Sequence, residues 1–528
     1  WMKDMPAEAW EKGRSVEILR NNIFTDKQES FVAAMDSTGR FSVRVPLVNT
    51  SEIYIDIGRK GINTVVEPGE TYFLLHDFST GHVLFMGEDV RFQNELQTHP
   101  PLYVDGYLRK GQGTVDEFRT QMEDKYRHAV EELSRRVEAH PNLSRRYRYF
   151  MESFALTGLG RSMMQARFAV PDWQLPEDYV DFVRTKVWQR PPKPYTLCQN
   201  FGILMRDYIG HSSKAKDKAR GNAVFNAFKR LRQRGEISMT EEEANTVEAY
   251  RLAIKELQEK LNVEPSDSLR QRMVVEFGKS DLGQRFISLF KRFEDVLNEE
   301  VLADNIDFWK ENAESAGCDS ILCQIHLARN LYRQIDNIRK PLPDRMMAKA
   351  EREIRLEGGW DIVSREQEKY VAIQNRDLSG VGSLKSAEDV KDVTGGEALL
   401  RKLTEPYRGK FILLDIWGTW CGPCKDALSH SQEEYQRLAK YDIQYMYLAN
   451  NSPKDTWENV IKEYNVTGSN VVHFNLPPGQ QQAIERYLKV ASFPTYKVID
   501  PEGRVLDVKV DPRNLDSTEK LFQMLTGK

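Results

Sequence analysis

Two cysteines near the C-terminal end of the chain are spaced for redox chemistry. Cys421 and Cys424 are separated by Gly422 and Pro423, and they closely follow an apolar run over residues 411–417. Such a run is typical of a strand buried on both faces, and the residues after Cys424 have a helical pattern. A Cys-x-x-Cys pair between a strand and a helix is typical of a dithiol that cycles between reduced and oxidised forms.

The predicted helix start gives the two cysteines different roles. Cys421 is expected where free backbone N–H groups and the positive end of the helix dipole favour a thiolate. A lowered pKa would make Cys421 the attacking thiol, more exposed and more acidic than Cys424. Cys424 follows one turn later and can close an intramolecular disulfide after the attack. This chemistry requires no bound cofactor.

The same spacing can also supply half of a zinc site. A structural zinc site usually has a second pair of ligands at similar spacing. The other close pair, Cys318 and Cys323, has four residues between its members, and no histidine pair flanks either pair. We therefore expect a redox pair and no metal site.

The residues around the cysteine pair resemble a known active site. Residues 417–425, Trp-Gly-Thr-Trp-Cys-Gly-Pro-Cys-Lys, are similar to the active site of the thioredoxin superfamily, in particular of TlpA-like thiol-disulfide reductases. Asp415, six residues before Cys421, stands where thioredoxins carry a buried acid. Residues 492–495, Ser-Phe-Pro-Thr, resemble the family's cis-proline loop, which faces the disulfide. The resemblance covers residues 384–528.

The resemblance implies a role for each residue of this set. Cys421 is expected to attack a substrate disulfide, and Cys424 to resolve the mixed disulfide. A carboxyl group in a buried strand has a raised pKa, so Asp415 is expected to accept the proton of Cys424, directly or through water. A hydrogen-bonded structural acid is the alternative. The residues expected to contact the substrate are Trp420, Gly422, Pro423, Phe493 and Pro494.

The expected function is that of a thiol-disulfide oxidoreductase that reduces protein disulfides, since Cys-Gly-Pro-Cys resembles the reducing members of the superfamily. Two alternatives stay open. The chain could be a partner-binding cell-envelope protein in which the redox domain is accessory. It could also be a thiol peroxidase of the related peroxiredoxin branch. A resemblance to that branch would include a Thr-x-x-Cys pattern. Gly418 stands three residues before Cys421, and this counts against the peroxidase alternative.

The resemblance also implies partners and a compartment. We expect protein disulfide substrates, an upstream membrane thiol-disulfide electron donor, and a location in the periplasm or cell envelope. The sequence starts at Trp1 without a signal segment, so a signal or a lipid anchor would lie outside it. The net charge of −4 gives no global attraction to nucleic acid, and we expect no nucleic-acid partner.

The length of 528 residues indicates a multidomain protein of about three domains. Short strands separated by turns predict an N-terminal β-sandwich domain over residues 1–100. Apolar residues at steps of three and four predict a mostly α-helical middle region over residues 101–377. A Ser/Gly-containing linker at 378–383 then precedes the C-terminal α/β thioredoxin fold, residues 384–528.

Local patterns in the first two regions give sharper expectations. Residues 39–45 alternate apolar and polar side chains, and the turn cluster 36–39 predicts a hairpin that joins them to residues 30–35. Thr240 and Glu243 have the spacing of a capping box at a helix start.

Three further cysteines lie in the middle region. Cys318 and Cys323 are too far apart to bond within a regular helix, but Cys318 is expected just outside a helix start, where the chain can fold back. A bridge between them therefore stays open. Cys198 is expected to be a buried, inert thiol.

Overall fold

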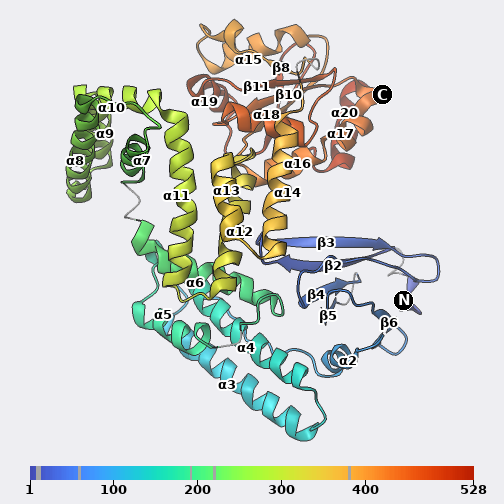
Figure 1. Cartoon of the computed structure of the whole chain (residues 1–528). Coiled ribbons are helices and arrows are strands. Elements are labelled where there is room, and N and C mark those ends of the chain that lie inside the picture. Colours follow the sequence, from blue (N-terminus) through green and yellow to red (C-terminus); the bar gives the residue numbers. More distant parts are fainter. Residues whose placement is uncertain (8–13, 58–60, 191–192, 218–221, 379–381) are drawn as a thin grey trace. The chain divides into compact units, whose positions relative to one another are not determined.

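A computed structural model describes residues 1–528 except 8–13, 58–60, 191–192, 218–221 and 379–381 (Figure 1). The chain divides into two compact units, each discontinuous in sequence. Unit 1 comprises residues 1–330 and 343–362, and unit 2 comprises residues 331–342 and 363–528. The division into three domains stays a prediction, and the predicted linker at 378–383 lies partly outside the described residues.

Unit 1 begins with two small sheets whose residues share one core. One sheet has the strand order β3-β2-β4-β5 and the other β1-β6-β7. Ile18 and Ile53 of the first sheet and Leu74 and Phe85 of the second belong to the same buried cluster. The β-sandwich arrangement itself stays a prediction. The strands are β1 Met2–Lys3, β2 Ser15–Asn22, β3 Lys27–Ala34, β4 Ser51–Asp56, β5 Gly61–Val66, β6 Phe73–Asp77 and β7 His82–Met86.

The predicted hairpin partner of β3 is wrong. Strand β3 pairs with β2, which the sequence analysis missed, and residues 40–47 form no strand. The turn at 36–39 does form, because the Gly39 N–H donates to the Asp36 carbonyl. The chain after it is extended, and its apolar side chains reach the core from Phe41, Val43 and Val45 without joining a sheet. The alternation of apolar and polar residues over 39–45 therefore reflects burial of every second side chain and not pairing with another strand.

The rest of unit 1 is mostly helical, as predicted. The capping box at Thr240 and Glu243 is confirmed at the start of α8. Helices α3 and α4 are long neighbours (Figure 1). The helices of unit 1 are α2 Arg91–Thr98, α3 Val115–Ala139, α4 Arg145–Gln165, α5 Glu177–Val183, α6 Gln199–Asp217, α7 Ala223–Gln233, α8 Glu241–Val263, α9 Asp267–Lys279, α10 Asp281–Arg292, α11 Glu294–Ser315 and α13 Asp344–Glu353. Helices α12 Ser320–Ile338 and α14 Glu357–Gln374 begin in unit 1 and end in unit 2. Within the described ranges, no helix is both long and apolar enough to cross a membrane.

Unit 2 is built on a six-stranded sheet with the order β13-β12-β9-β10-β11-β8. Strands β9, β10, β11 and β8 run parallel, whereas β12 is antiparallel to both β9 and β13. The strands are β8 Leu384–Lys385, β9 Ile412–Trp417, β10 Gln444–Ala449, β11 Val471–Phe474, β12 Thr495–Ile499 and β13 Val505–Leu506. The helices are α15 Gly396–Thr404, α16 Gly422–Ser429, α17 Ser431–Leu438, α18 Lys454–Glu463, α19 Pro478–Tyr487 and α20 Leu515–Thr526.

Helices cover both faces of this sheet, which explains the apolar run before the cysteines. On β9, Leu413 and Trp417 belong to one core with residues of α16, α17, α18 and α20. Ile412, Leu414 and Ile416 belong to the core on the other face, with residues of α15 and α19. Because side chains alternate along a strand, the side chain of Asp415 lies on the face covered by α16.

Candidate active site

The two cysteines lie at the junction of strand β9 and helix α16. Cys421 is the N-cap residue of α16, and its Sγ accepts a hydrogen bond from the Cys424 backbone N–H at 3.2 Å. The two are joined in a disulfide with their Cα atoms 5.3 Å apart. Cys421 is 5% exposed and Cys424 is 1% exposed, so the first cysteine is the nearer to solvent. The predicted helix-start position of Cys421 is confirmed.

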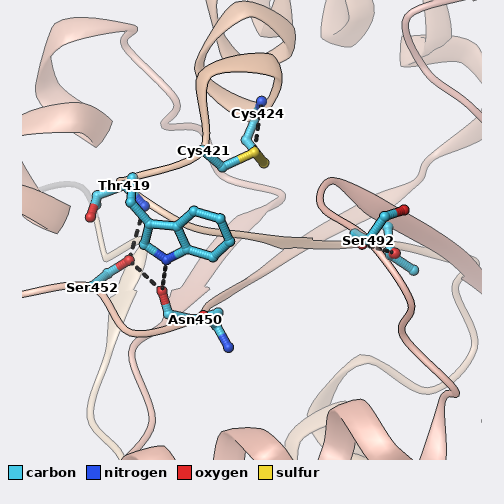
Figure 2. The surroundings of a disulfide bond; sticks show 8 residues. Thr419, Cys421, Cys424, Asn450, Ser452 and Ser492 are labelled. Carbon is cyan, nitrogen blue, oxygen red and sulfur yellow. Dashed lines mark hydrogen bonds between the residues drawn. A yellow bond between two sulfur atoms is a disulfide. The ribbon is translucent and has the colours of Figure 1, made fainter. Parts of the chain in front are cut away.

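Hydrogen bonds to the loop after β10 fix the segment that precedes Cys421 (Figure 2). The Thr419 backbone N–H donates to the Ser452 hydroxyl at 3.0 Å, and that hydroxyl donates to the Asn450 carbonyl at 2.9 Å. The Trp420 indole N–H donates to the same carbonyl at 3.1 Å. A Cβ at Gly418 would lie 2.6 Å from the Trp420 indole nitrogen, so this arrangement requires glycine there.

The five residues expected to contact a substrate come from two segments of unit 2, one at the cysteine pair and one before β12. Trp420 is 55% exposed and packs edge-on against Phe493, with ring centroids 5.1 Å apart. The peptide bond between Phe493 and Pro494 is cis, as the resemblance implied. Gly422 and Pro423, between the cysteines, are exposed. The large exposed fraction of the Trp420 ring makes it a surface that a substrate can contact.

Asp415 is buried in the middle of β9, where its neighbours in register are Tyr447 on β10 and Tyr496 on β12. Burial raises the pKa of Asp415 to about 8, and the nearby Arg513 charge opposes this only in part. Its Oδ1 atom has no hydrogen-bond partner among the described residues. Proton exchange with Cys424 and the alternative of a structural acid both stay predictions for Asp415.

One acidic residue near Asp415 was missed. Glu434 on α17 is 8% exposed, and it lines the same cavity as Asp415. Burial, with a contribution from the Asp415 charge, raises its pKa to about 8. The predicted single helix after Cys424 ends at Ser429 and restarts at Ser431 as α17. The sequence does contain a pattern that could have identified Glu434, because Ser431, Glu434 and Leu438 have the spacing of the buried face of that helix.

The other cysteines lie in unit 1 and are not paired. Cys318 and Cys323 are not bonded, and the Cys323 Sγ is 3.8 Å from the Cys318 carbonyl oxygen. Burial raises the pKa of the Cys323 thiol to about 11 and also raises that of Cys318. Cys198 is fully buried with a raised pKa, as expected for an inert thiol.

Comparison with known proteins supports the assignment of the C-terminal region. Residues 409–505 match the family model of a thioredoxin-like domain. The chain is 27% identical over 141 residues to the thiol-disulfide oxidoreductase ResA of Bacillus subtilis, a match that covers 26% of this chain and 73% of the relative. It is 30% identical over 125 residues to ResA of Geobacillus thermodenitrificans, covering 24% of this chain and 66% of the relative.

A solved structure also matches this region. The thioredoxin domain of a thiol-disulfide oxidoreductase from Bacteroides vulgatus is 17% identical, with a TM-score of 0.20, and the match covers 23% of this chain and 83% of that one. The two ResA matches cover about a quarter of the chain, which fits the extent of the redox region. The C-terminal region of the chain is thus a thioredoxin-like domain related to the ResA and TlpA proteins, and its enzyme class is thiol-disulfide oxidoreductase.

Proposed function

We propose that the chain reduces disulfide bonds in protein substrates through the Cys421–Cys424 dithiol. The observation that carries the proposal is the cysteine pair at the N-terminus of α16, beside the exposed ring of Trp420. A helix N-terminus stabilises a thiolate through its free N–H groups and its dipole. The Sγ of Cys421 already accepts one such N–H, that of Cys424.

The reaction proceeds in two exchange steps. The Cys421 thiolate attacks a substrate sulfur, so that a Cys421–substrate disulfide forms, the substrate disulfide breaks, and the leaving thiolate takes a proton. Cys424 then loses its proton and attacks the Sγ of Cys421, which forms the Cys421–Cys424 disulfide and releases the second substrate thiolate. Two electrons pass from the dithiol to the substrate. A dithiol electron donor must return the chain to its reduced form.

Asp415 is proposed as the base for the second step. It lies on the sheet face covered by α16, and a pKa of about 8 suits proton exchange with a thiol near neutral pH. This value lies near the ordinary pKa of a cysteine thiol, about 8.5, so a proton could pass between the two groups in either direction.

The substrate chain is proposed to lie across Trp420, Phe493 and Pro494, with Gly422 and Pro423 at its edge. The exposed Trp420 ring and the partly buried Phe493 ring offer apolar contact area that does not depend on substrate sequence. Gly422 leaves open space beside it, since no atom lies within 4 Å of a Cβ placed there. A polypeptide backbone can therefore approach the disulfide closely.

We further propose the periplasm or cell envelope as the compartment and a membrane thiol-disulfide protein as the electron donor. The resemblance to TlpA-like reductases supports both. The ResA relatives support the exchange chemistry, and the reducing direction rests on the Cys-Gly-Pro-Cys motif. The equilibrium direction depends on the reduction potential of the pair relative to that of its compartment.

Reduction of insulin disulfides by the full chain with excess dithiothreitol tests this function. Cys421→Ser should abolish the protein-dependent rate, because burial raises the pKa of the three cysteine thiols in unit 1 and makes them poor nucleophiles. Cys318→Ser is the matched control and should leave the rate unchanged. Loss of the rate in both variants, or in neither, would contradict the proposal.

The same variants separate the two alternatives. A peroxidase would consume hydrogen peroxide in a Cys421-dependent reaction, but this chain has Gly418 in place of the threonine of the peroxiredoxin pattern, and a Cβ there would clash with the Trp420 ring in its present position. A partner-binding protein with an accessory redox domain would keep its cellular role in the Cys421→Ser variant. Neither alternative predicts rapid, Cys421-dependent reduction of insulin.

A further inference from the structure

A cavity of about 520 Å³ in unit 2 connects Asp415 with helices α16 and α17 and with the segment 512–516. At about 30 Å³ per water molecule, the cavity can hold several waters. The side chains of Asp415 and Glu434 both line it, and so do Tyr447 and Tyr496. The cavity is therefore a polar passage beside the buried acid, on the sheet face that carries the cysteines.

Glu434 occupies a position where an apolar residue would stabilise the fold. It lies between Ser431 and Leu438 on the buried face of α17 and is 8% exposed. Leaving a carboxyl group there is costly unless it is neutral or solvated. Glu300 in unit 1 is also a buried glutamate, but Arg230 and Arg234 bind it directly. Glu434 instead faces the cavity and a second acid.

The two arginines at the cavity form ion pairs with acids other than Asp415 and Glu434. Arg437 binds Glu519 and Asp516, and Arg513 binds Asp511. The Arg513 charge lowers the pKa of Asp415 but leaves it far above its ordinary value, and the Asp415 charge raises the pKa of Glu434. Titratable groups line the cavity beside the pair from every element around it. They are Asp426 of α16, Glu433 and Arg437 of α17, Asp516 of α20, His430 and Arg513 of the connecting segments, and Tyr447 and Tyr496 of the sheet.

We propose that Glu434 is the proton outlet of the active site and acts through Asp415. The proposal rests on the function proposed above. When Cys424 is activated, its S–H bond breaks and the proton moves to the Asp415 carboxylate. Water in the cavity then carries a proton from Asp415 to the Glu434 carboxylate, and Glu434 releases it to solvent. Asp415 is thereby returned to its basic form before the next exchange, with no change in the electron balance.

Two carboxyl groups around one water-filled cavity have a measurable consequence. Each negative charge disfavours ionisation of the other, so the pair should titrate in two separate macroscopic steps. Removing the Glu434 charge should lower the titration midpoint of Asp415 by about one pH unit. A glutamate that only fills space would not produce this shift.

The test uses the full chain with three substitutions. Glu434→Gln removes the proton outlet with little change in shape, and Glu434→Asp keeps a carboxyl group. Glu397→Gln makes the same chemical change at an exposed position of α15 and serves as the control. Carbon-13 NMR of labelled carboxyl groups follows the titration, and stopped-flow measurement of the resolution step with an oxidised peptide gives the rate against pH.

For Glu434→Gln, we expect the midpoint of the profile of resolution rate against pH to fall by about one pH unit. The plateau rate should fall about tenfold, as expected when assisted proton transfer is lost. Glu434→Asp should restore most of the plateau, and Glu397→Gln should match the unmodified chain. Superimposable titrations and profiles for Glu434→Gln and Glu397→Gln would overturn the proposal. Failure of the unmodified chain to reduce any disulfide would contradict the proposed function, whereas the NMR titration would still decide whether the acids are coupled.

Discussion

Asp415 is a carboxyl group within an apolar strand, and its protonation state links the stability of unit 2 to its chemistry. The raised pKa means that the folded chain holds this proton up to about pH 8, whereas an unfolded chain releases it near the ordinary aspartate value. Between these limits the folded state binds more protons than the unfolded state. Stability therefore falls as pH rises from about 4 to about 8.

Asp415→Asn should remove this pH dependence. The amide cannot ionise, so the variant should be more stable than the unmodified chain by a few kcal/mol at pH 8, and the difference should shrink toward pH 4. The same variant should resolve mixed disulfides slowly, by a factor of about 100 or more. Urea unfolding at several pH values and single-turnover kinetics measure the two effects. A variant that is less stable at pH 8 and unchanged in rate would identify Asp415 as a structural acid.

Helix α18 shows how unit 2 uses residues outside the predicted thioredoxin region. The Arg339 guanidinium donates to Glu463 at 2.8 Å and to the Tyr370 hydroxyl at 2.7 Å. Arg339 and Glu463 have side chains only 9% and 10% exposed. The Asn459 amide donates to the Arg339 carbonyl at 2.8 Å. The ends of α12 and α14 are thus joined to α18 by buried polar contacts.

Arg339→Ala should destabilise unit 2 by about 3 kcal/mol, because it removes the guanidinium that donates to the buried Glu463 carboxylate. Within the described residues, that carboxylate then keeps only Lys369 and Tyr370 as partners. The neighbouring Lys340 provides a matched control. It pairs with Asp455 at 3.4 Å, and both side chains are well exposed, so Lys340→Ala should cost at most about 1 kcal/mol. Chemical denaturation of both variants measures the difference. Equal small losses would show that the Arg339 network contributes little.

Elements of the C-terminal region were predictable because local patterns determine them. The short runs over residues 471–474 and 495–499, each rich in β-formers, predict strands there, and β11 and β12 have these bounds. The run over residues 504–510 predicts a third strand, but β13 covers only Val505–Leu506, at the edge of the sheet with one neighbour. The pairing of β2 with β3 was missed because two candidate partners flank β3 and alternation alone does not choose between them.

Contacts between distant residues could not be predicted. Arg339 and Glu463 are 124 positions apart, and neither stands in a recognisable motif. The cysteine pair, Asp415 and the cis-proline loop were predictable because the chemistry requires those residues at those spacings. Glu434 could not be predicted as a site residue, because its importance depends on the break between α16 and α17 and on the cavity that both helices line.

The whole molecule separates one reactive cysteine pair from three cysteines that are buried or partly buried. Cys421 and Cys424 form the disulfide in unit 2, and Cys198, Cys318 and Cys323 are free in unit 1. Because their thiol pKa values are raised, the unit 1 cysteines should react slowly with disulfides. Exchange chemistry is thereby confined to the thioredoxin-like domain.

Counting thiols in oxidised, denatured and unreduced protein tests this separation. The structure predicts three free thiols when Cys421 and Cys424 are bonded. A count of one would show that Cys318 and Cys323 are bridged in the isolated protein, contrary to the structure. Peptide mapping after alkylation assigns each thiol, and the Cys318→Ser variant provides the control, with two free thiols expected.

The central claim is that Cys421 attacks a substrate disulfide and Cys424 resolves the intermediate. Trapping of that intermediate tests it most directly, because Cys424→Ser removes the resolving thiol and leaves the attacking one. Incubated with an oxidised protein substrate, the variant should accumulate a mixed disulfide, and mass spectrometry of its peptides should place the bond on Cys421. Cys421→Ser should accumulate little or none under the same conditions. A mixed disulfide at Cys198, Cys318 or Cys323, or one that forms faster at Cys424 in the Cys421→Ser variant, would contradict the account.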